Sequence, residues 1–212
     1  MNLTNKEKQI PEEFKDLAKE FADKGFITTS MDNLINCVEA ILLSSGRPVK
    51  ISEIRELIRL MDQKGELADI KKAIIDLDKR FTESALQIVE VASGYRIQIK
   101  NEYSRLLIPM WQDNSSKTSK ALMETLTIIA YKQPITRGEI ESIRGVSVST
   151  QIIRNLTERN WIKVSGYKDV PGRPALYKTT KEFLDDFQFK SIKDLPKITD
   201  TTSITDLELN FG

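Results

Sequence analysis

Residues 130–140 read Ala-Tyr-Lys-Gln-Pro-Ile-Thr-Arg-Gly-Glu-Ile. Apolar residues at helical spacing precede Pro134, and a proline at that point ends the helix. Thr136 and Glu139 have the spacing of a capping box, which predicts that a second helix begins at once. The stretch therefore predicts two short helices joined by a tight turn.

The pattern around this stretch predicts a complete small domain over residues 119–196. The two helices that meet near Pro134 are followed by a third, expected over about 147–159. Strands at 161–165 and 175–178 then flank a loop that contains several Gly and Pro residues. Three helices followed by a two-stranded hairpin are typical of a winged helix.

The same order of elements occurs once earlier, over residues 30–100. Apolar spacing predicts three helices, the first at 31–45, and then changes to strand-like alternation around Ser93-Gly94. Residues 47–54 align with 133–140, because proline, the β-branched residue after it, glutamate and isoleucine match at identical spacing. The predicted fold class is mainly α with small β-hairpins (α+β), arranged as two tandem winged-helix domains.

Three further segments complete the predicted organisation. Residues 1–29 form an N-terminal extension whose apolar spacing predicts a short amphipathic helix at 11–24, which either packs on the body or binds a partner. Residues 101–118 connect the two domains and are too apolar for a free linker. Residues 197–212 are polar and predict a flexible tail, whose last apolar residues could form a docking segment.

The composition argues against catalysis and against resident cofactors. Of the 212 residues, 40% are apolar. None is histidine, so the commonest side chain for proton transfer and metal binding is absent. Only one is cysteine, so no internal disulfide can form. The sequence contains neither a GxGxxG nor a GxxxxGK[ST] phosphate loop. We expect a non-enzyme without cofactor or metal, and no membrane span.

DNA binding is the main alternative for a chain of this kind, because winged helices often place their third helix in the major groove. The charge is balanced, with 32 basic and 31 acidic residues, and both third helices carry acids that repel phosphate. The second wing is more promising, since Lys163, Lys168, Arg173 and Lys178 lie on it. A tandem winged-helix transcription regulator stays the alternative function, and an enzyme accessory domain has no supporting motif.

Ordered motifs in the second unit resemble one known family, segregation and condensation protein B. They are Tyr131-Lys132-Gln133-Pro134-Ile135-Thr136, Ile143-Arg144-Gly145-Val146, Asp169-Val170-Pro171-Gly172-Arg173-Pro174, Thr179-Thr180-Lys181-Glu182-Phe183-Leu184 and Leu195-Pro196. The first unit resembles the family more weakly, through Glu39-Ala40-Ile41-Leu42 and Ser45-Gly46-Arg47-Pro48. The chain departs from the family pattern at Asn160-Trp161, where a glycine and an aliphatic residue are usual, and at Lys178, where a glycine is common.

The resemblance covers about residues 31–196 and implies a role as well as a fold. It implies a homodimer formed largely through the first winged-helix domain and a kleisin subunit (ScpA-like) bound mainly at the second. Through the kleisin the chain would join a pair of structural-maintenance-of-chromosomes (SMC) ATPases in bacterial condensin. We expect chromosome condensation and segregation during cell division, in the cytoplasm at the nucleoid, with indirect or weak DNA contact.

The same resemblance suggests which residues make these contacts. The kleisin is expected to contact Tyr131, Lys132, Gln133, Pro134, Arg144, Arg154, Arg173 and Tyr177. The dimer contact is expected to use apolar residues of the first helix and first wing, namely Leu34, Val38, Leu42, Tyr95 and Ile97.

Overall fold

The computed structural model describes residues 31–60, 66–111 and 119–197. Within these residues the chain is α+β, with eight α-helices, one short 3-10 helix and two small sheets. The helix expected at 11–24 and all of the expected tail except Lys197 lie outside the described residues.

The chain divides into two compact units, and the division does not follow a single cut. The first unit comprises residues up to Val89 together with Gly94–Tyr103. The second comprises Glu90–Ser93 and all residues from Ser104 onward.

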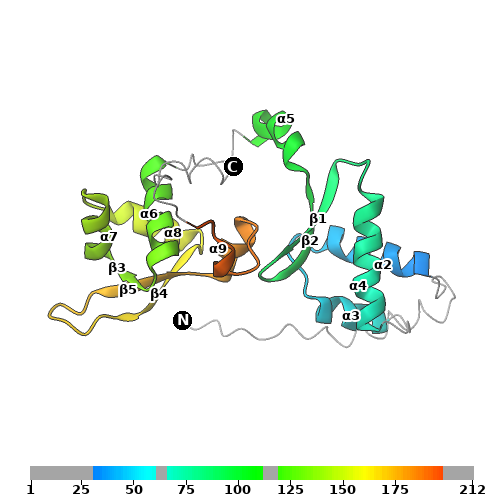
Figure 1. Ribbon diagram of the computed structural model, residues 1–212, viewed down its shortest axis with the longest axis horizontal. Coiled ribbons are helices and arrows are strands. Elements are labelled where there is room, and N and C mark those ends of the chain that lie inside the picture. Colours follow the sequence, from blue (N-terminus) through cyan, green and yellow to red (C-terminus); the bar gives the residue numbers. More distant parts are fainter. Residues whose placement is uncertain (1–30, 61–65, 112–118, 198–212) are drawn as a thin grey trace. The chain divides into compact units, whose positions relative to one another are not determined.

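The first unit combines three helices with a two-stranded hairpin (Figure 1). Its elements are α2 (Met31–Ser44), α3 (Ile51–Leu60), α4 (Leu67–Arg80), β1 (Leu86–Val91) and β2 (Gly94–Ile99). The last two residues of β1, Glu90 and Val91, fall in the second unit by the division above. All three helices bury one aliphatic face, and Val38, Ile54 and Leu77 are fully buried in the resulting core. The predicted first helix and the predicted hairpin are both confirmed.

A short extended piece joins the hairpin to the helices of the first unit. The Val49 amide donates to the Tyr95 carbonyl at 2.8 Å, and the Tyr95 amide donates back to the Val49 carbonyl at 2.9 Å. Gly94 stands beside this bridge with φ of +135°, and a Cβ at this position would collide with the Val49 backbone. Only glycine combines this backbone conformation with such a close approach.

Residues Asn101–Trp111 form helix α5, which the sequence analysis did not predict. They are the first 11 residues of the expected connector, and the division between the two units falls inside this helix, after Tyr103. Leu106 is 76% exposed on it, an unusual position for a leucine. The connector is therefore helical over most of its length.

The second unit has the same kinds of elements with a larger sheet (Figure 1). Its elements are α6 (Lys120–Lys132), β3 (Ile135–Thr136), α7 (Arg137–Arg144), α8 (Thr150–Glu158), β4 (Ile162–Tyr167), β5 (Ala175–Thr179), α9 (Lys181–Asp186) and the 3-10 helix η1 (Ile192–Asp194). The three strands are antiparallel in the order β3-β5-β4. The sequence analysis did not predict β3, which is two residues long.

The helix starts of the second unit follow local capping chemistry. The predicted capping box of α7 is confirmed, because the Glu139 amide donates to Thr136 Oγ1 at 3.3 Å and the Thr136 amide donates to Glu139 Oε2 at 2.8 Å. Helix α8 begins at Thr150 with Ser149 as its N-cap, three residues later than predicted. The Val148 amide donates instead to Glu141 Oε1 at 2.9 Å, so this residue is held outside the helix.

The family departure at Asn160-Trp161 has a structural explanation. Asn160 follows α8 with φ of +56°, a left-handed conformation that glycine adopts most easily and asparagine tolerates. Trp161 is 8% exposed in the core, where its ring meets Phe187 edge-on at 5.0 Å. Its indole N–H donates to Asp186 Oδ2 at 2.7 Å, so the polar atom of this large residue is satisfied.

Candidate partner-binding site

A basic groove of about 1070 Å³ lies on the second unit, and we call it the lysine groove. Among the described residues that line it, none is Asp or Glu. Six are lysines: Lys132, Lys163, Lys178, Lys181, Lys190 and Lys197. They come from the end of α6, the strands β4 and β5, the start of α9 and the residues after it. Segments far apart in the sequence thus gather charge of one sign.

The lysine groove also has an apolar part. Leu184, Ile192, Leu195 and Pro196 line it beside Ala130 of α6. Leu184 and Leu195 are half-buried and pack against the core of the unit, whereas Ile192 is 38% exposed. Apolar side chains ringed by lysines suit a ligand that carries both apolar groups and negative charge.

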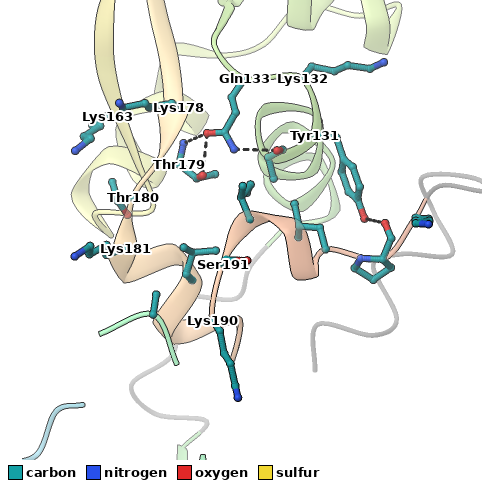
Figure 2. A pocket seen from close by; sticks show the side chains of 17 residues that line it. Tyr131, Lys132, Gln133, Lys163, Lys178, Thr179, Thr180, Lys181, Lys190 and Ser191 are labelled. Atoms are coloured by element: carbon teal, nitrogen blue, oxygen red, sulfur yellow. Dashed lines mark hydrogen bonds between the residues drawn. The ribbon is translucent and has the colours of Figure 1, made fainter. Parts of the chain in front are cut away.

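Two of the lysines are opposed directly across the sheet. Lys163 of β4 and Lys178 of β5 are register partners, and both are exposed. Figure 2 shows them together at one side of the groove, with Lys181 close by and Tyr131 on the opposite side. Like charges directly opposite each other in a sheet are destabilising. Within the described residues no ion pair neutralises Lys163, Lys178 or Lys181, whereas the groove lysine Lys190 pairs with Glu90 at 2.6 Å.

Gln133 fixes one wall of the groove. Its side-chain oxygen accepts hydrogen bonds from the Thr179 amide at 2.8 Å and from Thr179 Oγ1 at 2.9 Å, and its Nε2 donates to the Ala130 carbonyl at 3.0 Å (Figure 2). Helix α6 and strand β5 are thereby joined through one side chain. The predicted contact residue Gln133 thus makes three side-chain hydrogen bonds within its own unit.

Tyr131 fixes the other wall. Its hydroxyl donates to the Pro196 carbonyl at 2.6 Å, so the segment after η1 is tied to α6 (Figure 2). Burial raises the pKa of the Tyr131 phenol, so the hydroxyl is protonated and able to donate well beyond neutral pH. Lys132 is exposed beside it. Of the eight residues expected to contact the kleisin, Tyr131, Lys132 and Gln133 line the groove.

Arg144, another residue expected to contact the kleisin, is buried within the second unit. Its side chain is 8% exposed, and its Nη2 donates to Glu124 Oε2 at 2.8 Å. The buried Nε has no hydrogen-bond partner among the described residues. An arginine enclosed in this way holds α7 against α6 and presents little surface to a partner.

The remaining four predicted contact residues do not line the groove. Pro134 and Arg154 are exposed, and Arg154 Nε donates to Glu158 Oε1 at 2.7 Å on the same face of α8. Arg173 is exposed in the loop between β4 and β5, with φ of +37°. Tyr177 is half-buried in β5 and packs against the core.

The residues predicted for the dimer contact lie mostly inside the first unit. Val38 is 0% and Leu42 is 4% exposed, so both belong to the core and have no surface left for a second chain. Leu34, Tyr95 and Ile97 are half-buried against the same core. Helical spacing marked Leu34, Val38 and Leu42, and strand alternation marked Tyr95 and Ile97. Any core-facing surface shows the same patterns, which is why the sequence did not separate the two roles.

Sequence reasoning noticed Lys163 and Lys178 as wing residues but did not join them to α6 or to the residues after α9. No periodic pattern places these segments together, because their proximity depends on the strand register. The available signals were family motifs whose residues line the groove, among them Thr179-Thr180-Lys181 and Leu195-Pro196.

Other kinds of site have no support in the part of the chain that the structure describes. No three His, Cys, Asp or Glu side chains in these ranges gather closely enough to hold a metal ion. Among the same residues, no helix has the length and apolar character needed to cross a membrane.

Comparison with known proteins agrees with the motifs. Residues 36–198 match the family described as "Segregation and condensation complex subunit ScpB". The chain is 41% identical to the segregation and condensation protein B homolog of Coxiella burnetii, over 82% of this chain and 83% of that protein. It is 38% identical to segregation and condensation protein B of Clostridium tetani, over 76% of this chain and 84% of that protein.

Solved structures are similar as well, among them the crystal structure of ScpB from Mycobacterium tuberculosis, at 24% identity and a TM-score of 0.35, over 74% of this chain and 96% of that one. The family match covers more than half of the chain, and the identities extend over most of it. This chain is therefore a member of the ScpB family of segregation and condensation complex subunits.

Proposed function

We propose that this chain is a non-catalytic adaptor of bacterial condensin, which dimerises through its first unit and binds the kleisin subunit with its second. Membership of the ScpB family gives it a role in chromosome segregation and condensation. The same membership does not favour the alternative of a DNA-binding transcription regulator. The adaptor would act at the nucleoid and reach the SMC ATPases through the kleisin.

Both units, over about 30–100 and 119–196, are proposed to be winged helices. Three helices precede a hairpin in each, and in each the residue after the shared proline pairs with the wing: Val49 with Tyr95 and Ile135 with Tyr177. This common pairing supports the internal repeat that the sequence suggested. In this proposal residues 101–118 connect the two domains.

The lysine groove is the observation that carries the kleisin proposal. Lys163 and Lys178 repel each other across the sheet in the free chain, and a carboxylate between them would convert that repulsion into attraction. Leu184 and Leu195 would receive apolar side chains of the same segment. We therefore propose that an acidic, partly apolar segment of the kleisin lies in this groove against Tyr131 and Lys132.

Two of the expected contact residues are assigned supporting roles in this proposal. Arg144 positions α7 through its ion pair with Glu124, and Gln133 holds β5 on α6. Pro134, Arg154, Arg173 and Tyr177 would contact only a kleisin segment that continues beyond the groove.

The dimer contact is proposed to use exposed apolar residues next to the core ones. Leu43 of α2 is 54% exposed and Ile99 of β2 is 39% exposed, and neither belongs to the core of the unit. Both lie on the elements that the sequence analysis assigned to the dimer, the first helix and the first wing. Half-buried Leu34, Tyr95 and Ile97 would contribute their remaining surface.

The test is co-expression with the kleisin encoded in the same genome, followed by mass determination by light scattering. We expect a complex with two copies of this chain per kleisin. The double variant Lys163→Glu/Lys178→Glu should weaken kleisin binding by about tenfold or more, since it reverses the charge that the groove presents.

The matched control is Lys71→Glu/Lys72→Glu, which changes two exposed lysines on α4 of the first unit and should leave kleisin affinity unchanged. Circular dichroism of both variants checks that they fold. Equal affinities for the two variants would contradict the groove assignment, and a chain that ignores the kleisin altogether would contradict the adaptor role.

A further inference from the structure

The described part of the chain ends at the lysine groove. Lys197, its last residue, lines the groove together with Pro196. Residues 198–212 follow, and they contain Asp200, Asp206 and Glu208 but no Lys or Arg. An acidic segment thus follows the basic groove in the sequence. The segment and the groove have opposite charge and are covalently linked through Lys197.

The end of this segment also matches the apolar part of the groove. Residues 206–211 read Asp-Leu-Glu-Leu-Asn-Phe, with strict alternation of polar and apolar side chains. In an extended chain such alternation directs Leu207, Leu209 and Phe211 to one side and the two acids to the other. One face would meet Leu184, Ile192 and Leu195, while the other would meet lysines.

Residues 198–205 would link the segment to the groove. This link allows the segment to reach the groove and also keeps it at a high local concentration there. Asp206 is nine residues beyond Lys197, which allows a reach of up to about 30 Å when extended at roughly 3.3 Å per residue. A short flexible tether gives an effective concentration on the order of millimolar. Even a weak affinity between segment and groove would therefore keep much of the groove occupied.

We propose that residues 206–211 of this chain dock in the lysine groove of the same chain and compete with the partner segment for it. The proposal concerns regulation of the site in the proposed function and shares its groove. The kleisin can bind only those chains whose groove the tail has left free. The apparent affinity for the kleisin is therefore reduced in proportion to the fraction of free grooves. A partner segment rich in acidic and apolar side chains can displace the tail from the groove, whereas a weakly acidic segment cannot and is excluded from it.

Zero-length cross-linking of the full chain tests the contact directly. A carbodiimide joins a carboxylate to an amine only when the two touch, and mass spectrometry identifies the joined peptides. We expect Asp206 or Glu208 to be linked to Lys163, Lys178 or Lys181. An equal mixture of chains with normal and heavy nitrogen should give links within one isotope only. Links between the isotopes, or links to Lys71 of α4 at equal yield, would overturn the proposal.

Lysine acetylation of full-length variants provides the second measurement. Asp206→Lys/Glu208→Lys should raise the acetylation rates of Lys163 and Lys178 by about threefold, because a charge-reversed tail no longer covers them. The matched control Asp206→Glu/Glu208→Asp keeps both charges and should leave the rates as they are. Lys71 and Lys72 should react equally in all three proteins. Unchanged rates at Lys163 and Lys178 in the reversed variant would overturn the proposal.

Both measurements are made without kleisin, which separates this proposal from the proposed function. If the tail protects the groove but kleisin binds Lys163→Glu/Lys178→Glu as tightly as the unchanged chain, the docking stands and the kleisin site lies elsewhere. If kleisin binding needs the groove but Asp206→Lys/Glu208→Lys does not increase kleisin affinity, the competition is disproved. An increase of about threefold in that variant is the expected result.

Discussion

Both units have three helices followed by a hairpin, but they differ in the contacts that hold the extended piece before the second helix against the hairpin. In the first, the extended residue before α3 makes a single bridge, Val49 to Tyr95, which depends on Gly94. In the second, the equivalent residue Ile135 belongs to a three-stranded sheet, and Gln133 adds hydrogen bonds between α6 and β5. A single backbone bridge joins the extended piece to the wing in the first unit, whereas strand pairing and the Gln133 side chain together do so in the second.

Charge differs between the units as well. Helix α4 of the first unit mixes signs, with Asp76 bound to Lys79 at 2.9 Å within a single turn. The lysine groove of the second unit gathers six lysines without a lining acid. Mixed charge of the first kind is ordinary solvated surface, and charge of one sign is typical of a surface that binds a charged partner.

The largest expected effect tests whether the two cores are equivalent. Ile54 and Ile140 occupy aligned positions in the repeat, and both are 0% exposed. Substitution of either by alanine should cost about 2–5 kcal/mol, because buried methylene groups are lost and a cavity is left. Urea unfolding of Ile54→Ala and Ile140→Ala measures the two losses.

Equal losses would establish that the units are stabilised alike despite their different closures. The exposed Ile143→Ala in α7 serves as the control, since Ile143 is 46% exposed. A loss at Ile143 as large as that at Ile140 would contradict the burial argument.

A second test separates the closures of the two wings. Gly94→Ala should destabilise the first unit by about 2–3 kcal/mol, since the new Cβ meets the Val49 backbone in a strained conformation. Gly166→Ala in β4 of the second unit should cost less than about 1 kcal/mol, because open space surrounds that position. Thermal unfolding of both variants gives the comparison, and similar losses would show that close approach is not what distinguishes Gly94.

The smallest effect concerns acid. Hydrogen bonds from Lys168, and then from the Thr136 backbone and side chain, lower the pKa of Glu139 from 4.5 to about 2. A lowered folded-state pKa means that this carboxylate stabilises the fold above pH 4.5 and that the contribution is lost as the pH falls toward 2. Because 43% of the Glu139 side chain is exposed, solvent screening keeps the effect below about 1 kcal/mol.

Unfolding free energies of the chain and of Glu139→Gln, measured at pH 6 and near pH 2, test this contribution. The variant should lose less stability on acidification than the unchanged chain. The aligned variant Glu53→Gln of the first unit is the comparison, since Glu53 pairs with Arg47 instead of capping a helix. An unchanged acid dependence in Glu139→Gln would contradict the role of the capping box.

Local signals were sufficient where the chemistry is local. The capping box at Thr136 and Glu139, the start of α2 at residue 31 and the hairpin around Ser93-Gly94 were all predictable, because each depends on residues a few positions apart. Helix α5 was not predicted, because the apolar character of residues 101–118 indicates only that the connector is not a free linker. Strand β3 was missed because a two-residue strand exists only through its pairing with β5.

The candidate site was predictable only in part for the same reason. Motifs directed attention to Tyr131, Lys132 and Gln133, which do line the groove. They also selected Arg144, Val38 and Leu42, which are buried within their own units. A motif marks a residue as constrained, and burial decides whether the constraint is structural or serves a partner.

The sequence by itself determined the helices other than α5, the order of three helices and a hairpin in both units, and the family, since periodicity, capping and motif spacing are properties of neighbouring residues. Only the tertiary structure decided that Lys163 stands opposite Lys178, that Tyr131 meets Pro196, and that these pairs border one groove. Strand register and the return of the chain after α9 bring these residues together. Such long-range contacts depend on the packing of the whole unit, and no short stretch of sequence encodes them.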